Sequence, residues 1–159
     1  MSVLRVVMYH YVRPVAESRF PAIKGLDLGA FRAQVSALAS RFELCSLERG
    51  LRFLRGEEPG GDRDLCLLTF DDGLAEHHDH VTPVLVDAGA SGCFFLSTRC
   101  HEGTFVATVH KTHHLLADLG AQRFEAAVGA ACRRRAVPDR GRATRAAVSC
   151  QSQGQRSQV

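Results

Sequence analysis

Apolar residues form several short, unbroken runs along the chain, and each run is bounded by polar residues or by glycine. Runs of this kind are typical of strands that are buried in a sheet. The strands predicted from them are residues 3–9, 42–45, 65–70 and 92–96.

Between these runs, apolar residues recur three or four positions apart, which predicts helices. Asp27 and Ser46 precede the first two helices and are expected to act as their N-caps. Pro83 fits the first turn of a third helix, which Gly89 is expected to end. Strands that alternate with helices in this way predict an α/β fold with a largely parallel sheet. The apolar residues expected to face the core are Phe31, Val35 and Leu38 in the first helix and Val84, Leu85 and Val86 in the third.

Length and composition are those of one ordinary globular domain: 159 residues, 45% of them apolar and 23% charged. The six cysteines are scattered without a Cys-x-x-Cys pair, so neither a disulfide framework nor a structural zinc site is expected. No apolar run reaches membrane-spanning length, and the first residues lack the pattern of a signal peptide. We therefore expect a cytoplasmic protein without a membrane partner.

Positive charge is concentrated near the C-terminus. The formal net charge is +3, yet residues 133–159 contain seven arginines and one aspartate, a net of +6, which leaves −3 for residues 1–132. The last stretch also lacks apolar periodicity, so we predict a folded domain over residues 1–132 and a disordered basic tail over residues 133–159. The tail has no aromatic residue on which a base could stack, so no specific nucleic-acid partner is expected.

Two adjacent carboxylates and a glycine, Asp71-Asp72-Gly73, end the strand predicted at residues 65–70. Neighbouring side chains on a strand point to opposite faces, so both carboxylates reach one side only where the chain turns sharply, which Gly73 permits. Two close carboxylates repel each other unless a cation compensates, and sites in α/β folds gather at the carboxyl ends of strands. Asp-Asp-Gly is also ordinary turn chemistry, so a metal site and a simple turn both remain open on spacing alone.

A longer resemblance favours the metal site. Thr69-Phe70-Asp71-Asp72-Gly73 resembles the first motif of the polysaccharide deacetylases, the NodB-homology family of carbohydrate esterases (family 4). Val6-Val7-Met8-Tyr9-His10-Tyr11-Val12 resembles the opening strand and Tyr-His signature of that family, and Gly92-Cys93-Phe94-Phe95-Leu96 resembles the strand after the motif. The resemblance covers roughly residues 3–120 and implies the N-terminal portion of a distorted, partial β/α barrel.

The resemblance also implies an activity, the metal-dependent removal of acetyl groups from an N-acetylated sugar or polysaccharide. Asp72 would then hold a divalent metal ion, for which zinc is the expectation, and Asp71 would act as general base on the attacking water. The partner implied is a carbohydrate substrate, whose sugar and linkage the sequence does not specify. No residue is identified as the acid that protonates the leaving amine.

Three histidines are candidates to complete the metal site. His10 follows the first predicted strand and stands at the same rim as the aspartates. It is a candidate metal ligand, substrate contact or hydrogen-bonded structural support. His110 and His114 are four positions apart, so on a helix they lie on one face and could grip one ion. The family's second motif has this spacing, but Lys111 and Leu115 stand where it has a hydroxyl residue and a proline. The alternative is an inserted helix with surface histidines.

A second histidine group, His77, His78 and His80, is interpreted as the exposed, polar start of a helix. Adjacent residues on a helix point in different directions, so these three side chains do not converge on one ion. No metal site is predicted there.

The family's later motifs, an arginine-containing loop and a late histidine, are not found in this sequence. We therefore hypothesise that the chain is a truncated copy, or that its reading frame changes near residue 130. This makes a catalytically inactive remnant or sugar-binding fragment one alternative, with self-association through exposed sheet edges. A second alternative is a magnesium-dependent phosphoryl-transfer or receiver-type domain, which needs a lysine partner, and only Lys24 and Lys111 are present.

Overall fold

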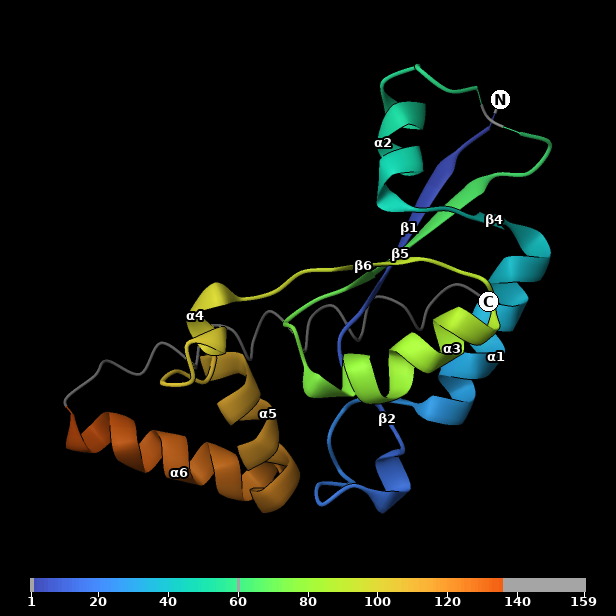
Figure 1. Cartoon of the computed structure of the whole chain (residues 1–159). Coiled ribbons are helices and arrows are strands. Elements are labelled where there is room, and N and C mark those ends of the chain that lie inside the picture. The colour runs from blue at the N-terminus through green and yellow to red at the C-terminus, as the bar shows by residue number, and fades with distance from the viewer. Residues whose placement is uncertain (1, 60, 136–159) are drawn as a thin grey trace, which may run out of the picture. The chain divides into compact units, whose positions relative to one another are not determined.

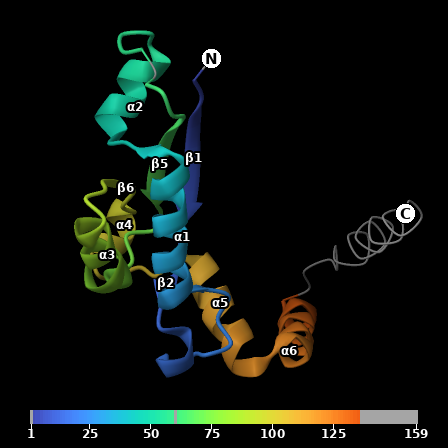
Figure 2. The same cartoon turned by 90° about the vertical axis from the view of Figure 1, so that its right-hand side faces the viewer.

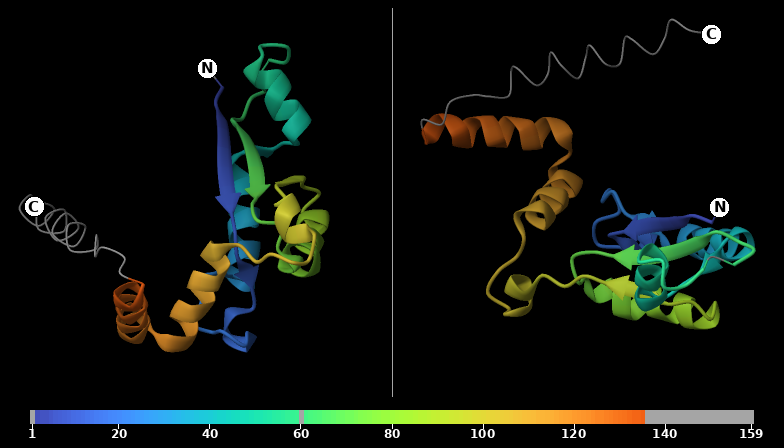
Figure 3. Two further views of the ribbon diagram at one scale, coloured as in Figure 1. Left: turned by 90° about the vertical axis from the view of Figure 1, so that its left-hand side faces the viewer. Right: turned by 90° about the horizontal axis from the view of Figure 1, so that it is seen from above.

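The computed structural model describes residues 2–59 and 61–135. Its larger sheet is parallel and is built around β5 (Leu65–Phe70), which pairs with β1 (Leu4–Tyr9) along its whole length. On the other side of β5, β4 (Glu43–Leu44) pairs with its first residues and β6 (Gly92–Phe94) with its last. Figure 3 shows β1 and β5 side by side, with their arrows pointing the same way. The parallel α/β prediction is confirmed, whereas the β/α barrel stays a prediction.

Helices follow the strands in sequence (Figure 1). α1 (Leu28–Arg41) and α2 (Leu47–Leu54) begin where the sequence predicts. The side chains of Asp27 and Ser46 each accept a hydrogen bond from a backbone N–H of the first turn, which satisfies a donor that has no partner within the helix. The other elements outside the third helix are β2 (Val12–Arg13), the 3-10 helix η1 (Val15–Glu17), β3 (Leu26–Asp27), α4 (Thr98–His101), α5 (Thr108–Leu119) and α6 (Ala121–Arg134).

The third helix differs from the prediction in two ways. A π-helix, η2 (His77–Val81), leads directly into α3 (Thr82–Asp87), so the chain is already helical before the predicted start. Val86 is 70% exposed, so the prediction that it faces the core was wrong. Val84 and Leu85 face the core as predicted, whereas three consecutive helical residues point in directions too different for Val86 to face it as well.

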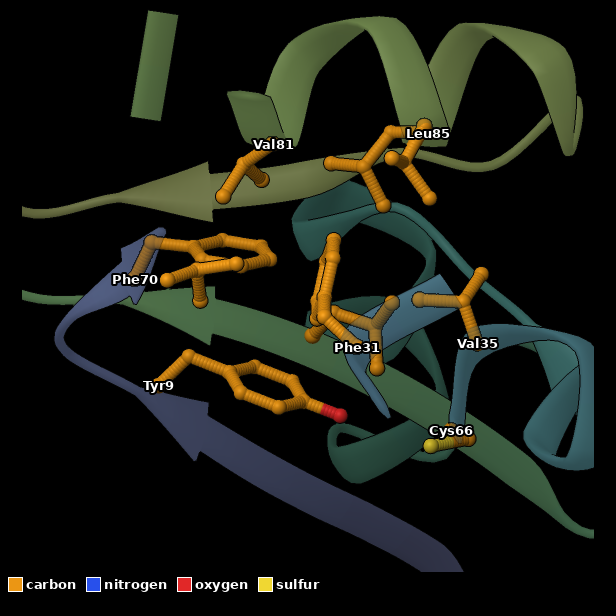
Figure 4. Packing of buried hydrophobic residues seen from close by; sticks show 10 residues of the cluster. Tyr9, Phe31, Val35, Cys66, Phe70, Val81 and Leu85 are labelled. Atoms are coloured by element: carbon orange, nitrogen blue, oxygen red, sulfur yellow. The ribbon is translucent and has the colours of Figure 1, made fainter. Parts of the chain in front are cut away.

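The main hydrophobic core lies between one face of the larger sheet and the helices α1 and α3 (Figure 4). Phe31 of α1 packs edge-on against Tyr9 and Phe70, with ring centroids 5.1 and 6.0 Å apart. Tyr9 and Phe70 are paired across β1 and β5, and their rings stack at 5.3 Å. α1 lies along the two strands (Figure 2), so this aromatic cluster fixes the helix at their carboxyl ends. The buried residues of this core are Tyr9, Val12, Phe31, Val35, Cys66, Leu68, Phe70, Val81, Val84 and Leu85.

The opposite face of the sheet is only partly covered. Leu65 and Leu67 of β5 are buried there together with Cys45. Val6 and Met8 of β1 belong to the same face, because paired residues in neighbouring strands point the same way, and they are 58% and 59% exposed. Apolar residues exposed along an edge strand favour association between sheets, and self-association stays a prediction.

The described residues divide into two compact units, with the boundary between Asp118 and Leu119, and α6 belongs to the second. The predicted boundary after residue 132 stays a prediction, because residues 136–159 of the expected tail lie outside the described residues. All cysteines within the described ranges are free. No helix in the described part of the chain has both the length and the apolar character needed to cross a membrane.

Candidate functional site

The two aspartates of the predicted motif follow β5, whose six residues are all buried. The backbone nitrogen of Asp71 donates a hydrogen bond of 3.0 Å to the carbonyl of Tyr9, so the pairing with β1 continues one residue beyond the strand. Asp72 then adopts a left-handed φ of 78°, and Gly73 follows at 61°. Aspartate tolerates this region better than most residues with a side chain. The turn predicted at the glycine therefore begins one residue earlier.

An open pocket of about 440 Å³ lies at this end of β5. Its lining consists of Asp71, Asp72 and residues 95–97, which follow β6. A Cβ at Gly73 would come within 2.6 Å of the exposed Leu96 side chain, which would have to shift, so the glycine is required mainly for its left-handed backbone conformation. The sharp turn thus brings both carboxylates to the same pocket, as the sequence predicts.

His10, the residue after β1, lies beside the first aspartate. Its Nε2 is 3.9 Å from Oδ2 of Asp71, and the two side chains are 45% and 30% exposed. The carbonyl of His10 accepts a hydrogen bond of 2.8 Å from Nε2 of His77. His10 therefore stands at the predicted rim. Its position suits a structural support or a substrate contact, which need no additional protein residue, and its role as a metal ligand stays a prediction.

His110 of α5 lies beside the second aspartate. Its Nε2 is 3.8 Å from Oδ2 of Asp72, and the side chains are 12% and 29% exposed. The other ring nitrogen, Nδ1, is hydrogen-bonded to the hydroxyl of Tyr11. His110 is thus not a surface histidine, and both of its nitrogens face specific groups.

His114, the second member of the predicted pair, has different surroundings. Its ring packs edge-on against Phe20 at 4.7 Å, and its Nδ1 is buried with no hydrogen-bond partner. Burial lowers the pKa of His114, and the charge of Arg13 acts in the same direction. No group of three or more metal-binding side chains occurs among the described residues, so a joint ligand role for His110 and His114 stays a prediction.

The histidines of η2 do not all behave as the sequence predicts. His78 is exposed, but His77 is only 4% exposed, so its interpretation as part of an exposed helix start was wrong. Its ring packs against those of Phe70 and Phe94, at centroid distances of 5.6 and 5.9 Å. The π-helix places this residue against the sheet, and His77 serves to hold the segment after β1.

Two residues that support the site were not singled out from the sequence. Tyr11 is 5% exposed and contacts the rings of His110 and His113 edge-on. Glu76 accepts a hydrogen bond of 2.7 Å from the backbone nitrogen of Val12 and forms an ion pair with Arg13. The Tyr-His signature consists of Tyr9 and His10, so it did not mark Tyr11, and nothing local marked Glu76.

The lysine that a phosphoryl-transfer domain would need is not found beside the aspartates. Lys111 of α5 lies with its Nζ 5.8 Å from the centre of the Phe105 ring. Lys24 is exposed in the segment before β3. Nothing in the described part of the chain favours this alternative.

Comparison with known proteins bears on the fold. No protein-family model matches the chain, and no curated protein matches it in sequence. Among solved structures, the chain is similar to the deacetylase PplD of Streptococcus pyogenes, determined in complex with acetate. The TM-score is 0.52 at 20% identity, and the match covers 65% of this chain and 46% of that chain.

Two further solved structures are similar with TM-scores below 0.5. The de-N-acetylase of Aggregatibacter actinomycetemcomitans gives 0.48 at 20% identity, covering 57% of this chain and 36% of that chain. IcaB of Ammonifex degensii gives 0.47 at 24% identity, covering 60% and 40%. The chain spans less than half the length of each of these three proteins. The described sheet and helices are thus similar in fold to part of the PplD structure.

Proposed function

We propose that this chain forms part of a metal-dependent deacetylase that acts on N-acetylated sugars or polysaccharide. The observation that carries the proposal is the arrangement of two aspartates at the carboxyl end of β5, each facing a histidine of a different segment. The similarity in fold to PplD supports it, as does the resemblance of the Asp71-Asp72-Gly73 motif. In this proposal the four parallel strands are one portion of a distorted β/α barrel.

Asp72 and His110 are the residues proposed to hold the metal ion. A carboxylate and an imidazole suit zinc, and two such ligands of a tetrahedral zinc ion lie about 3.3–3.6 Å apart. The 3.8 Å between Oδ2 of Asp72 and Nε2 of His110 differs from this by a few tenths of an ångström. The pair therefore fits two positions of a zinc site, and further ligands would come from outside this pair.

Asp71 is proposed as the general base that takes a proton from the attacking water. When bound, a zinc ion would supply Lewis acidity to that water and to the amide carbonyl. His10, 3.9 Å from Asp71, is suited to orient this carboxylate toward the pocket. The pocket is open, as the mouth of a site for a polymeric sugar needs to be.

A non-catalytic, sugar-binding or purely structural fragment is the second candidate. It is favoured by the lack of a three-residue metal cluster among the described residues, because a catalytic zinc ion is normally held by about three protein ligands.

Zinc titration by calorimetry, followed by an acetate-release assay on N-acetylglucosamine oligomers, tests the proposal. Asp72→Asn keeps a side chain that tolerates the left-handed backbone but removes the charge, and should weaken zinc binding by at least about tenfold. Asp71→Asn should abolish acetate release and leave zinc binding nearly unchanged. Asp79→Asn, at an exposed carboxylate beside His78, is the matched control and should change neither.

Each outcome bears on one candidate. Zinc binding that is indifferent to Asp72→Asn would overturn the metal site. Zinc binding that depends on Asp72 without any acetate release would favour the non-catalytic fragment.

A further inference from the structure

Tyr11 is the buried residue through which α5 meets the segment after β1. It is 5% exposed, and its ring is surrounded edge-on by those of His110, His113 and His114, at 5.5, 5.7 and 6.4 Å. Its hydroxyl is hydrogen-bonded to Nδ1 of His110. One side chain therefore sets how the proposed ligand helix approaches the aspartates.

The hydrogen bond has a consequence for the chemistry of His110. A neutral imidazole carries one N–H, so the partner of one nitrogen decides which nitrogen holds the proton. Nδ1 faces the hydroxyl of Tyr11, and Nε2 faces Asp72 at 3.8 Å. The hydroxyl of Tyr11 can either donate a hydrogen bond to Nδ1 or accept one from it.

We propose that Tyr11 is the positioning residue for His110. It holds Nε2 toward Asp72 and partners Nδ1 in both tautomers of the ring. Without metal, the hydroxyl donates to Nδ1, and Nε2 carries the proton that faces the carboxylate. With a cation held at Nε2, the single proton of the neutral ring would sit on Nδ1, and Nδ1–H would donate to the hydroxyl oxygen. The ring stays neutral, and the contact with Tyr11 is kept.

The backbone around Tyr11 is fixed well enough for this role. Its carbonyl accepts a hydrogen bond of 2.9 Å from the backbone nitrogen of Leu26. The next residue, Val12, is held by Glu76, and the guanidinium of Arg13 lies 5.0 Å from the centre of the Tyr11 ring. A ring held on several sides can impose its direction on a partner, as the groups behind metal-binding histidines do.

The inference rests on the metal site of the proposed function, and the test separates the two. The variant is Tyr11→Phe, which keeps the ring and removes the hydroxyl. Tyr9→Phe is the matched control, because the hydroxyl of Tyr9 contacts Gln34 of α1 instead. The measurements are the nitrogen-15 signals of the His110 ring, with and without zinc, and zinc affinity by calorimetry.

In the metal-free protein, the ring of His110 should hold its proton on Nε2, and Tyr11→Phe should shift its Nδ1 signal toward that of a nitrogen without a hydrogen bond. Zinc should move the proton to Nδ1 in the unaltered chain. Zinc affinity should fall by about 10-fold to 100-fold in Tyr11→Phe, and Tyr9→Phe should change neither quantity.

An Nδ1 signal that is the same in Tyr11→Phe and in the unaltered chain would overturn the inference. So would bound zinc without a change of tautomer. If the unaltered chain binds no zinc, the proposed metal site fails, and the metal-free ring signals alone still decide whether Tyr11 positions His110.

Discussion

The carboxylate of Glu76 accepts a hydrogen bond of 2.7 Å from the backbone nitrogen of Val12, although 64 positions separate the two residues. The other carboxylate oxygen of Glu76 pairs with the guanidinium of Arg13. The side chains of Arg13 and Glu76 are 17% and 10% exposed, so the pair is largely withdrawn from water. This contact joins the segment after β1 to the segment after β5, and both segments carry residues of the proposed site.

Glu76→Ala should therefore destabilise the fold strongly. The variant leaves a largely buried guanidinium and a backbone N–H without partners. The free energy of unfolding, measured by urea denaturation, should therefore fall by about 3–5 kcal/mol. Glu76→Gln keeps an acceptor for Val12 and should cost less.

The exposed ion pair of Arg32 and Asp87 provides the control for the Glu76 variants. Its side chains are 52% and 73% exposed, so Asp87→Ala should cost less than about 1 kcal/mol. Equal losses in Glu76→Ala and Asp87→Ala would contradict the prediction.

Local patterns were sufficient to predict much of the scaffold. The strand at residues 65–70, the caps at Asp27 and Ser46, and the inward positions of Phe31 and Val35 each depend on residues a few positions apart. The exposure of Val86 could not be predicted in this way, because it depends on which part of a short helix meets the sheet.

The core gives a second prediction. Phe31 is fully buried and packs edge-on against Tyr9 and Phe70, so Phe31→Ala should lower the free energy of unfolding by about 3–5 kcal/mol, through lost burial and the cavity that remains. Leu54 is 66% exposed on α2, and Leu54→Ala should change the free energy of unfolding by no more than about 0.5 kcal/mol. Chemical denaturation of both variants checks the difference, and a small loss in Phe31→Ala would mean that the described core is wrong.

Gly92, at the start of β6, supports a third prediction. A Cβ at this position would lie 2.9 Å from the Phe70 ring and 2.8 Å from Leu85. The Phe70 ring is fully buried and cannot move aside easily, so Gly92→Ala should destabilise the fold by about 1–3 kcal/mol. At Gly61 a Cβ would meet only the flexible end of Glu43, at 3.3 Å, so Gly61→Ala should lie within about 0.5 kcal/mol of the unaltered chain. Thermal unfolding of the pair tests this, and similar midpoints would contradict it.

The candidate site was predictable only where its residues are close in sequence. Asp71 and Asp72 are adjacent, and their motif follows a recognisable strand. The hydrogen bond between Tyr11 and His110 joins residues 99 positions apart, and no sequence periodicity in either segment predicts it. Sequence reasoning could place His110 on a helix, but only the packing of that helix brings it to Asp72.

The pH dependence of stability gives the last prediction. Burial lowers the pKa of His114, the charges of Arg13, His110 and His113 lower it further, and Glu76 opposes them. The unfolded chain, in which the histidine has its usual pKa of about 6.5, then binds more protons than the folded chain once the pH falls below that value. The contribution of His114 to stability is therefore complete above about pH 6.5 and is lost as the pH falls toward the folded pKa.

His114→Phe removes this titration and keeps a ring that can pack against Phe20. The loss of unfolding free energy between about pH 7.5 and pH 5.5, measured without metal by urea denaturation, should be smaller in His114→Phe than in the unaltered chain. His78→Phe is the matched control for the introduction of a phenylalanine, because the His78 side chain is 91% exposed. If His114→Phe retained the full loss on acidification, another group would have to be the source of the acid sensitivity.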